Sequence, residues 1–403
     1  MTGGLVKRAA LVGGAALLLV GAMAAAAGAR TDARGTTAAT IKVGIVYSRT
    51  GALAGFGNEY VDGFKLGLKY ARSTTKNCGG NNFQVTYVDD QTVAGNAVNA
   101  AKDLIGKGYK IIAGSTSSGA ALQVAPLADQ NNILFISGAA AGDAITGLNR
   151  HTFRAGRQSY QDVLDARGFL PAKSVGKKIV VFAEDTAFGA SNVAAVTDVF
   201  GGKGHTVSKV LAPFQTADLT PYIQQLKNAN ADLVFVAWAG SNAAAMWNGL
   251  RQQGIMSSTT VTTGLPDRVN YPTLGPLFEG AKLLSHYVYQ APKNNVNKWL
   301  VAQMKKQGKV PDLFTPDGFV TAQMICRAVQ KAGGDGNVDR MISALEGWQF
   351  AAPKGRQRIR QADHAMIQPM FQVQLVKQGS KYEPKVLKTV SPGNVQPPVH
   401  PFS

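Results

Sequence analysis

Short apolar runs alternate with amphipathic stretches along most of the chain, beginning near residue 41. Runs rich in β-branched residues predict strands, and stretches with apolar residues at helical spacing predict helices. The predicted strands are residues 41–47, 83–88, 110–113, 133–136, 178–183, 207–211, 232–238 and 259–263. Predicted helices lie between them, at residues 57–71, 94–106, 119–131, 191–200, 220–228 and 243–253. Such alternation is typical of α/β proteins with parallel sheets.

The pattern changes after residue 290, where three helical runs follow one another without intervening strands. An amphipathic helix must bury its apolar stripe, so we expect these helices to return to the first sheet. Residues 365–375 alternate again and predict a late strand. We therefore expect two Rossmann-like lobes with parallel sheets, joined by three crossover segments around a cleft. The expected lobes are residues 41–155 with 286–358 and residues 156–285 with 359–390, followed by a C-terminal tail at 391–403.

The first 40 residues have the features of an export signal. Lys7 and Arg8 precede an uncharged run at 9–27, and the small residues Ala27-Gly28-Ala29 follow. This pattern predicts a signal peptide at 1–29, cleaved after Ala29, and a flexible tether at 30–40. A retained membrane anchor is the alternative, because about 20 apolar residues can span a bilayer. The protein is expected outside the cytoplasmic membrane, in a periplasm or at the cell surface.

Length and composition agree with a folded protein of two or more domains. The 403 residues are 45% hydrophobic, and 42 Lys and Arg outnumber 24 Asp and Glu. Nucleic-acid binding is not expected, because the basic residues are scattered and lack interleaved aromatic side chains. A mild cluster at Lys354, Arg356, Arg358 and Arg360 is interpreted as solvated basic surface.

Two cysteines, Cys78 and Cys326, are present. An exported protein with an even number of cysteines can form a disulfide, but a buried free thiol at Cys326 is the alternative. No metal site is expected, because the chain lacks Cys-x-x-Cys and His-x-x-x-His spacings.

Several motifs occur in an order that resembles one family. They are Thr-Gly-Ala-Leu-Ala-Gly-Phe-Gly at 50–57, Gly-Ser-Thr-Ser-Ser at 114–118, Ile-Leu-Phe-Ile-Ser-Gly-Ala-Ala-Ala at 133–141, Thr-Phe-Arg at 152–154, Glu-Asp-Thr-Ala-Phe-Gly at 184–189 and Asp-His at 363–364. The order resembles that of leucine/isoleucine/valine-type solute receptors of ABC importers, the type I periplasmic binding proteins. The resemblance implies a monomer that closes on a small solute, requires no cofactor, catalyses no reaction and docks on membrane permease subunits.

The resemblance also implies a ligand site in the small-residue loops after two strands. Ser118, Ala139 and Ala141 match positions that hold the ligand's carboxylate and amino group in the family. Independently, helix N–H groups beyond the carboxyl ends of parallel strands suit an anion. Simple tight turns are the alternative interpretation of these loops.

Aromatic residues are candidates for the walls of the same site. Phe56 and Phe188 match positions where the family has tyrosines that line the cleft, and Trp238 lies close to a third such position. Tyr160 follows the first expected crossover. Core packing is the alternative role for each of these residues.

The expected ligand class depends on whether the site offers an acidic partner for an ammonium group. The family's acidic partner for an ammonium group aligns closest to Pro266, although Asp267 serves if the loop shifts by one residue. A buried ammonium group without a partner is costly. The candidates are therefore amino acids, amides, and aromatic or aliphatic carboxylates.

A secreted hydrolase that acts on a small substrate in the same cleft is the alternative function. Residues 73–76 match Ser-x-x-Lys, but no Ser-Asp-Asn or Lys-Thr-Gly follows. His364, next to Asp363, is interpreted as a structural contact near the third crossover rather than a catalytic base.

Overall fold

A computed structural model describes residue 1 and residues 40–76, 78–170 and 173–402. Apart from residue 1, the predicted signal peptide and the tether as far as residue 39 lie outside these residues. None of the helices in the described part of the chain is long and apolar enough to cross a membrane.

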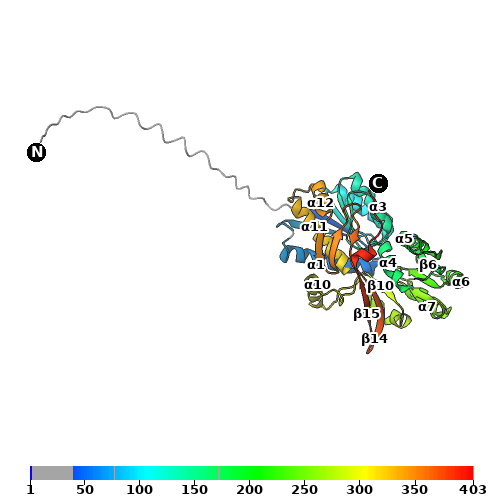
Figure 1. The fold of residues 1–403 in the computed structure, drawn as a ribbon. Coiled ribbons are helices and arrows are strands. Elements are labelled where there is room, and N and C mark those ends of the chain that lie inside the picture. The colour runs from blue at the N-terminus through cyan, green and yellow to red at the C-terminus, as the bar shows by residue number, and fades with distance from the viewer. Residues whose placement is uncertain (2–39, 77, 171–172, 403) are drawn as a thin grey trace. The chain divides into compact units, whose positions relative to one another are not determined.

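The first sheet contains five parallel strands in the order β2–β1–β3–β4–β5, coloured blue to cyan in Figure 1. They are β1 (Thr40–Tyr47), β2 (Asn82–Asp89), β3 (Ile111–Gly114), β4 (Leu134–Ser137) and β5 (Thr152–Arg154). The helices between them are α1 (Ala54–Ser73), α2 (Ala94–Gly106) and α3 (Ser118–Gln130). Every residue of β3 and β4 is buried, as expected for a parallel sheet covered on both faces by helices.

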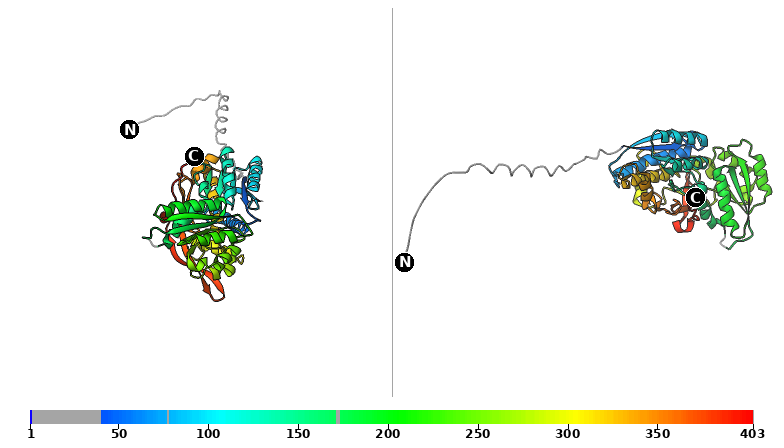
Figure 2. Two further views of the ribbon diagram at one scale, coloured as in Figure 1. Left: turned by 90° about the vertical axis from the view of Figure 1, so that its right-hand side faces the viewer. Right: turned by 90° about the horizontal axis from the view of Figure 1, so that it is seen from above.

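The second sheet contains four parallel strands in the order β7–β6–β8–β9 and lies in the green part of Figure 2. Its strands are β6 (Lys178–Asp185), β7 (Thr206–Pro213), β8 (Leu233–Ala237) and β9 (Thr260–Thr262). The helices of this region include α4 (Ser159–Ala166), α5 (Ala187–Val196), α6 (Thr220–Asn228) and α7 (Ala243–Gln252). The predicted α/β class with two parallel sheets is confirmed.

The late helices pack on the first sheet through close contact between α1 and α11 (Thr315–Lys331) (Figure 1). Glycines on α1 make this contact possible. A Cβ on Gly63 would lie 1.8 Å from the carbonyl oxygen of Thr315, and one on Gly67 would lie 2.4 Å from that of Phe319. α10 (Asn295–Lys305) and α12 (Val338–Leu345) complete this group of helices.

The last part of the chain contains more strands than the sequence predicted. One antiparallel sheet has the order β10–β14–β15, formed by β10 (Leu283–Ser285), β14 (Met370–Gln378) and β15 (Lys381–Val390). Another joins β11 (Gln349–Ala352), β12 (Gly355–Ile359) and β13 (Met366–Ile367). β12 and β13 pair with each other across the boundary expected at 358/359. The change of sheet therefore comes after residue 367 rather than after residue 358.

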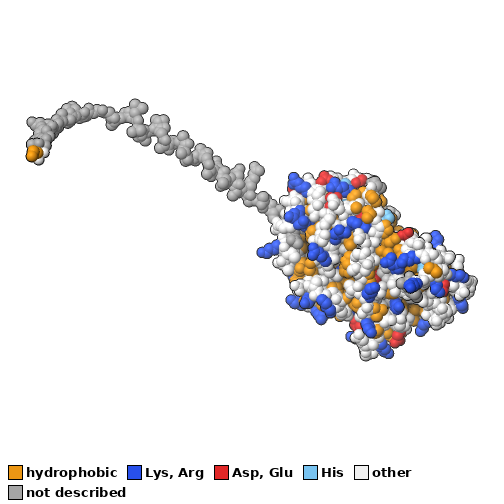
Figure 3. All heavy atoms as spheres, in the orientation of Figure 1, with side chains coloured by type: hydrophobic (Ala, Val, Ile, Leu, Met, Phe, Trp, Pro, Cys, Tyr) orange, Lys and Arg blue, Asp and Glu red, His pale blue; other side chains and the backbone are white. Residues whose placement is uncertain are grey.

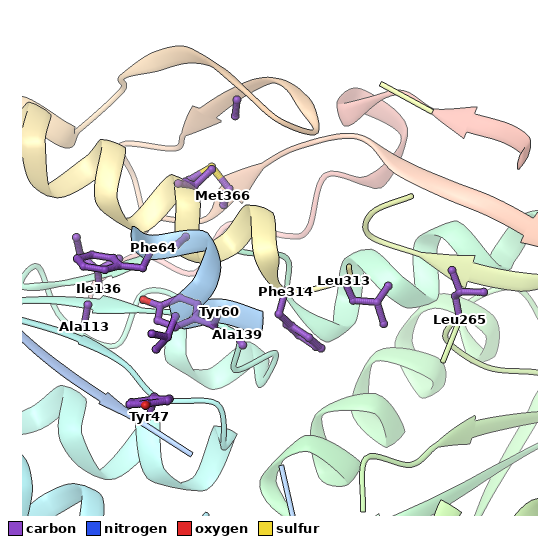
Figure 4. Packing of buried hydrophobic residues seen from close by; sticks show 14 of the residues in the cluster. Tyr47, Tyr60, Phe64, Ala113, Ile136, Ala139, Leu265, Leu313, Phe314 and Met366 are labelled. Atoms are coloured by element: carbon purple, nitrogen blue, oxygen red, sulfur yellow. The ribbon is translucent and has the colours of Figure 1, made fainter. Parts of the chain in front are cut away.

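A buried apolar cluster continues from the first sheet to the second. Figure 4 shows part of it, with Tyr60 and Ile136 on one side and Leu265 on the other. Leu313 and Phe314, which immediately precede α11, lie between these two groups (Figure 4). The segment that leads into α11 therefore contributes to the packing between the two sheets.

The basic cluster at residues 354–360 is only partly solvated, which corrects its interpretation as basic surface. Arg356 and Arg358 are exposed, whereas Lys354 is 2% exposed and Arg360 is 7% exposed. Lys354 Nζ lies 2.5 Å from Asp317 Oδ1, and Arg360 makes an ion pair with Asp363. Elsewhere, Lys and Arg side chains are scattered over the visible surface (Figure 3).

A disulfide joins Cys78, in the turn before β2, to Cys326 of α11. Both cysteines are buried, and Ala71, Leu68 and Phe83 pack around them. The sequence left open whether the two cysteines are bonded, and in the structure they are. The bond connects positions 248 residues apart in the sequence.

The C-terminal segment is built into the fold. Residues 391–402, here called the C-terminal strap, contain four prolines: Pro392, Pro397, Pro398 and Pro401. The guanidinium of Arg360 donates to the carbonyl oxygens of Pro397 and Pro398 at 2.7 Å each, and Phe402 packs on His364 with ring centroids 4.6 Å apart. Gly147 accommodates the strap, because a Cβ there would lie 1.9 Å from the His400 oxygen.

The strap leads to a first prediction. Deleting residues 397–403 leaves two N–H groups of Arg360 without their carbonyl partners and uncovers the His364 ring. We expect the free energy of unfolding to fall by about 2 kcal/mol, because hydrogen bonds to charged groups contribute about 1.5–3 kcal/mol. Urea denaturation followed by circular dichroism measures this change. Phe402→Ala should reproduce part of the loss and the exposed control Val399→Ala should not; equal effects of the two would contradict a packed strap.

Candidate functional site

A cavity of about 600 Å³ lies between the two sheets, at the carboxyl ends of their strands. The loops after β3 and β4 form one wall, and the loops after β6, β8 and β9 form the opposite wall. Open α/β sheets bind ligands at this edge, because loops leave the strands there with free backbone groups. The sequence-predicted residues Ser118, Ala139 and Ala141 all line this cavity.

The small-residue loops after β3 and β4 bring several hydrogen-bond donors together, and this group of donors is here called the donor cradle. Ser118 Oγ accepts from the N–H of Gly142 at 3.0 Å, which joins the loop after β3 to the loop after β4. Since this oxygen is already an acceptor, its hydroxyl proton remains available for a ligand. The side chain of the N-cap residue Ser117 accepts a hydrogen bond from the N–H of Ala120. The N–H groups of Ser118 and Gly119 lie in the first turn of α3, where backbone N–H groups have no acceptor within the helix. This arrangement suits a carboxylate.

Aromatic side chains from both sides of the molecule line the same cavity. Phe56 of α1 packs against Phe314, with ring centroids 4.8 Å apart. On the opposite wall, Phe188 lies in the first turn of α5 and Trp238 comes directly after β8. Trp238 Nε1 donates to Asn242 Oδ1 at 2.9 Å, which fixes the indole ring. Three of the four predicted wall aromatics therefore lie in the cavity.

Tyr160, the fourth, is not among the residues that line this cavity. Its hydroxyl donates to Asp198, and its backbone N–H donates to Asp143 Oδ1 at 3.0 Å. Burial, together with Asp198, raises the pKa of the phenol to about 12. These contacts hold the start of α4 in place, so Tyr160 has a structural role.

Asp267 lines the cavity, as does Pro266. Asp267 Oδ1 accepts a hydrogen bond from Asn270 Nδ2 at 2.6 Å. Asp267 Oδ2 lies 3.6 Å from the position that a Cβ would take on Gly55, which is on the opposite wall. Burial raises the pKa of this carboxyl. The loop after β9 therefore brings an acidic group into the site, as the shifted alignment required.

Four further titratable residues of the cavity were missed by the sequence analysis: Arg157, Asp162, Glu184 and His286. Glu184 holds the loop after β8, because its Oε2 accepts the N–H groups of Ala239 and Gly240 at 3.0 Å each. Burial lowers the pKa of His286 well below its usual value, so this imidazole is neutral at physiological pH. In the sequence, these residues are marked only by their position next to a strand end or a crossover. Many residues with a purely structural role have the same position, so it does not identify a binding residue.

Hydrogen bonds connect the two walls beside the cavity. The N–H of Arg268 donates to Asp312 Oδ2 at 2.5 Å, and the N–H of Asp143 donates to Ser191 Oγ at 2.6 Å. Burial raises the pKa of Asp312 to about 6. The structure therefore shows the two sides in direct contact around the cavity.

Two parallel α/β sheets with a lined cavity between them define a two-lobed, solute-binding α/β protein. The chain belongs to the periplasmic binding protein family, whose sequence model matches residues 40–381. It is a solute-binding protein of the ABC-transporter type and acts outside the cytoplasm. The predicted resemblance is confirmed.

Relatives and solved structures agree with this classification. The Leu/Ile/Val-binding protein homolog 3 of Brucella melitensis is 24% identical over 318 residues, which cover 76% of this chain and 83% of the relative. An ABC-type branched-chain amino acid transporter structure from Rhodopseudomonas palustris is 29% identical, with a TM-score of 0.74 and coverage of 90% and 100%. A solute-binding protein from the same species, in complex with 4-hydroxybenzoate, is 22% identical, with a TM-score of 0.79 and coverage of 87% and 97%.

Proposed function

We propose that this protein captures a small carboxylate-bearing organic solute in the cavity and delivers it to an ABC importer. The carboxylate is held by Ser118 and the backbone at Ala139 and Ala141. The organic part is held between Phe56, Phe188 and Trp238. The observation that carries the proposal is the presence of a donor cradle and aromatic walls in one cavity, with contributions from both lobes.

Two ligand classes are compatible with this cavity. Aromatic acids fit the aromatic walls, and structural neighbours bind 4-hydroxybenzoate and benzoate. Amino acids are the second class, favoured by the position of Asp267, whose carboxylate supplies a partner for an ammonium group. The Leu/Ile/Val-binding relatives point in the same direction.

The remaining parts of the proposal concern the mature protein and its cycle. We expect cleavage after Ala29, a monomer of two lobes, and hinge closure about the three crossovers when the solute binds. The solute is released unchanged to the permease. Chromatographic recovery of intact ligand after prolonged incubation distinguishes this receptor from a hydrolase, which consumes its ligand.

A thermal-shift screen of the exported protein, stripped of carried-over ligand, tests the proposal. The probes are leucine, benzoate, 4-hydroxybenzoate and two amides that lack the carboxylate: leucinamide, which keeps the ammonium group, and the neutral benzamide. A ligand that binds the folded state alone stabilises it by about 2.7 kcal/mol at a hundredfold excess over Kd. We expect a shift of a few degrees for at least one carboxylate. The carboxylate proposal is overturned if none of the three carboxylate probes gives a shift.

Two substitutions then identify the class and the site. Asp267→Asn should abolish the shift given by leucine but leave the shift given by benzoate, which has no ammonium group. Ser118→Ala and Trp238→Ala should each weaken the binding of whichever carboxylate is bound. Unchanged affinity in both of these variants would place the ligand elsewhere.

A further inference from the structure

Arg157 is a buried cation beside the donor cradle. It lies in the first crossover, three residues after β5, and only 8% of the residue is exposed. Its Nη1 donates to the carbonyl oxygen of Ala139 at 3.3 Å, and its Nε lies 3.2 Å from Asp162 Oδ2. Its guanidinium carbon lies 5.5 Å from the centre of the Phe314 ring. The positive group therefore stands next to the loop that is proposed to hold the ligand's carboxylate.

The hydrogen-bonding capacity of Arg157 is not exhausted by these partners. A guanidinium has five N–H donors, and the bonds to Ala139 and Asp162 use Nε and one N–H of Nη1. Nη2 has no partner among the described residues, and it is not among the nitrogens sealed from solvent by protein atoms. Arg157 thus retains N–H donors without a partner among the described residues, and the residue lines the cavity.

The neighbouring Arg154 shows what a purely structural arginine looks like in this fold. Its Nη1 donates to the carbonyl oxygen of Gly142 at 2.9 Å, and its Nη2 donates to those of Ala140 and Arg157 at 2.7 and 2.8 Å. Arg154 does not line the cavity. Arg154 therefore stabilises the backbone of the loop after β4 without lining the cavity, whereas Arg157 lines the cavity in which the ligand is proposed to bind.

Asp162 explains how the cation is tolerated before a ligand binds. Both side chains are at most 10% exposed, and an isolated buried charge would be costly. The pair is neutral overall, and a planar guanidinium can share its donors between two carboxylates. Binding a carboxylate at Nη2 would therefore require no rearrangement of the Asp162 contact.

We propose that Arg157 binds the carboxylate of the solute and makes the receptor select carboxylates over neutral molecules of the same shape. This inference rests on the proposed function of the cavity and deepens it. A neutral amide has one oxygen acceptor and no charge, so it cannot form the ion pair, and its NH2 group takes the place of the second acceptor. The selectivity therefore depends on the ligand's charge rather than on its size.

The test measures the ratio of the affinities for benzoate and benzamide, and for leucine and leucinamide, by titration calorimetry. Arg157→Gln should weaken the bound carboxylate about 10- to 100-fold, the range expected for loss of a hydrogen bond to a charged group, and should change amide binding little. Arg157→Lys keeps the charge and loses the planar fork, so an intermediate ratio is expected. The matched control is Arg268→Gln, which removes a half-buried arginine that is paired with Glu383 outside the cavity lining.

The outcomes separate this inference from the proposed function. If the wild type binds a carboxylate and the ratio is the same in Arg157→Gln, Arg157 is only a structural partner of Asp162 and the inference is wrong. If the wild type binds none of the carboxylates, the proposed ligand class fails and the inference fails with it. Should Arg157→Gln not fold, as judged by circular dichroism, the ratio in Arg157→Lys decides: an unchanged ratio overturns the inference.

Discussion

Replacing Lys354 by methionine is expected to lower the free energy of unfolding by about 3–5 kcal/mol, the usual cost of removing one partner of a buried ion pair. The side chains of Lys354 and Asp317 are both fully buried, and their charged atoms lie 2.5 Å apart. Without Lys354, the carboxylate of Asp317 would remain in the interior, where its Oδ2 already lacks a hydrogen-bond partner among the described residues. Urea denaturation of the wild type and the variant measures the difference.

The second substitution Asp317→Asn should recover at least half of this loss in the double variant, because an amide carries no uncompensated charge. Arg356→Met, two residues later in the sequence but exposed, is the matched control and should change stability by less than about 0.5 kcal/mol. Equal effects of Lys354→Met and Arg356→Met would show that the buried pair contributes nothing specific.

Lys354 also illustrates why part of the fold was not predictable from sequence. The run at 354–360 contains four basic residues, and local composition favours an exposed surface. In the structure β12 alternates, with Arg356 and Arg358 facing solvent and Gln357 and Ile359 buried. The inward position of Lys354 depends on Asp317, 37 residues earlier on a helix. A partner of this kind is set by tertiary packing, and no local pattern reveals it.

The two parallel sheets, in contrast, were predictable because their strands are locally distinctive. β3 and β4 are short, fully buried and apolar except for Ser137 at the end of β4, which is the pattern of strands buried on both faces. The hairpin of β11 and β12 is short: β11 has only four residues, and β12 carries two arginines and no apolar run. It was missed for this reason, and the pairing of β12 with β13 was missed with it.

In the candidate site, too, some residues were predictable from local sequence and others depend on tertiary contacts. Ser118, Ala139 and Ala141 follow strand ends, so topology alone places them at the ligand-binding edge. Arg157 lies between a strand and a helix in a crossover, where a charged residue is ordinarily a surface group. Its entry into the cavity depends on Asp162 and on the carbonyl of Ala139. The polar residues proposed to confer specificity could therefore be assigned to the cavity only from the structure.

Removing the disulfide is the second change with a large expected effect. Cys78 and Cys326 are 248 residues apart in the sequence, and the chain-entropy account assigns about 5.5 kcal/mol to a cross-link that closes a loop of that length. We expect Cys78→Ala/Cys326→Ala to lower the free energy of unfolding by this amount. Alanine is chosen for both positions because a buried serine hydroxyl would add a cost of its own.

The site of the bond indicates where the loss should first be seen. Cys326 is buried in α11, which packs along α1, and Cys78 lies four residues before β2. The bond therefore fastens the turn that sets the start of an edge strand to the helix pair that covers the first sheet. Amide hydrogen exchange should increase at residues 78–85 before it increases in β3 or β4. A reductant should shift the urea midpoint of the wild type to that of the double variant and leave the double variant unchanged. A wild-type midpoint that does not move, although both thiols have become reactive, would show that the packing around Cys326 holds this region without the covalent bond.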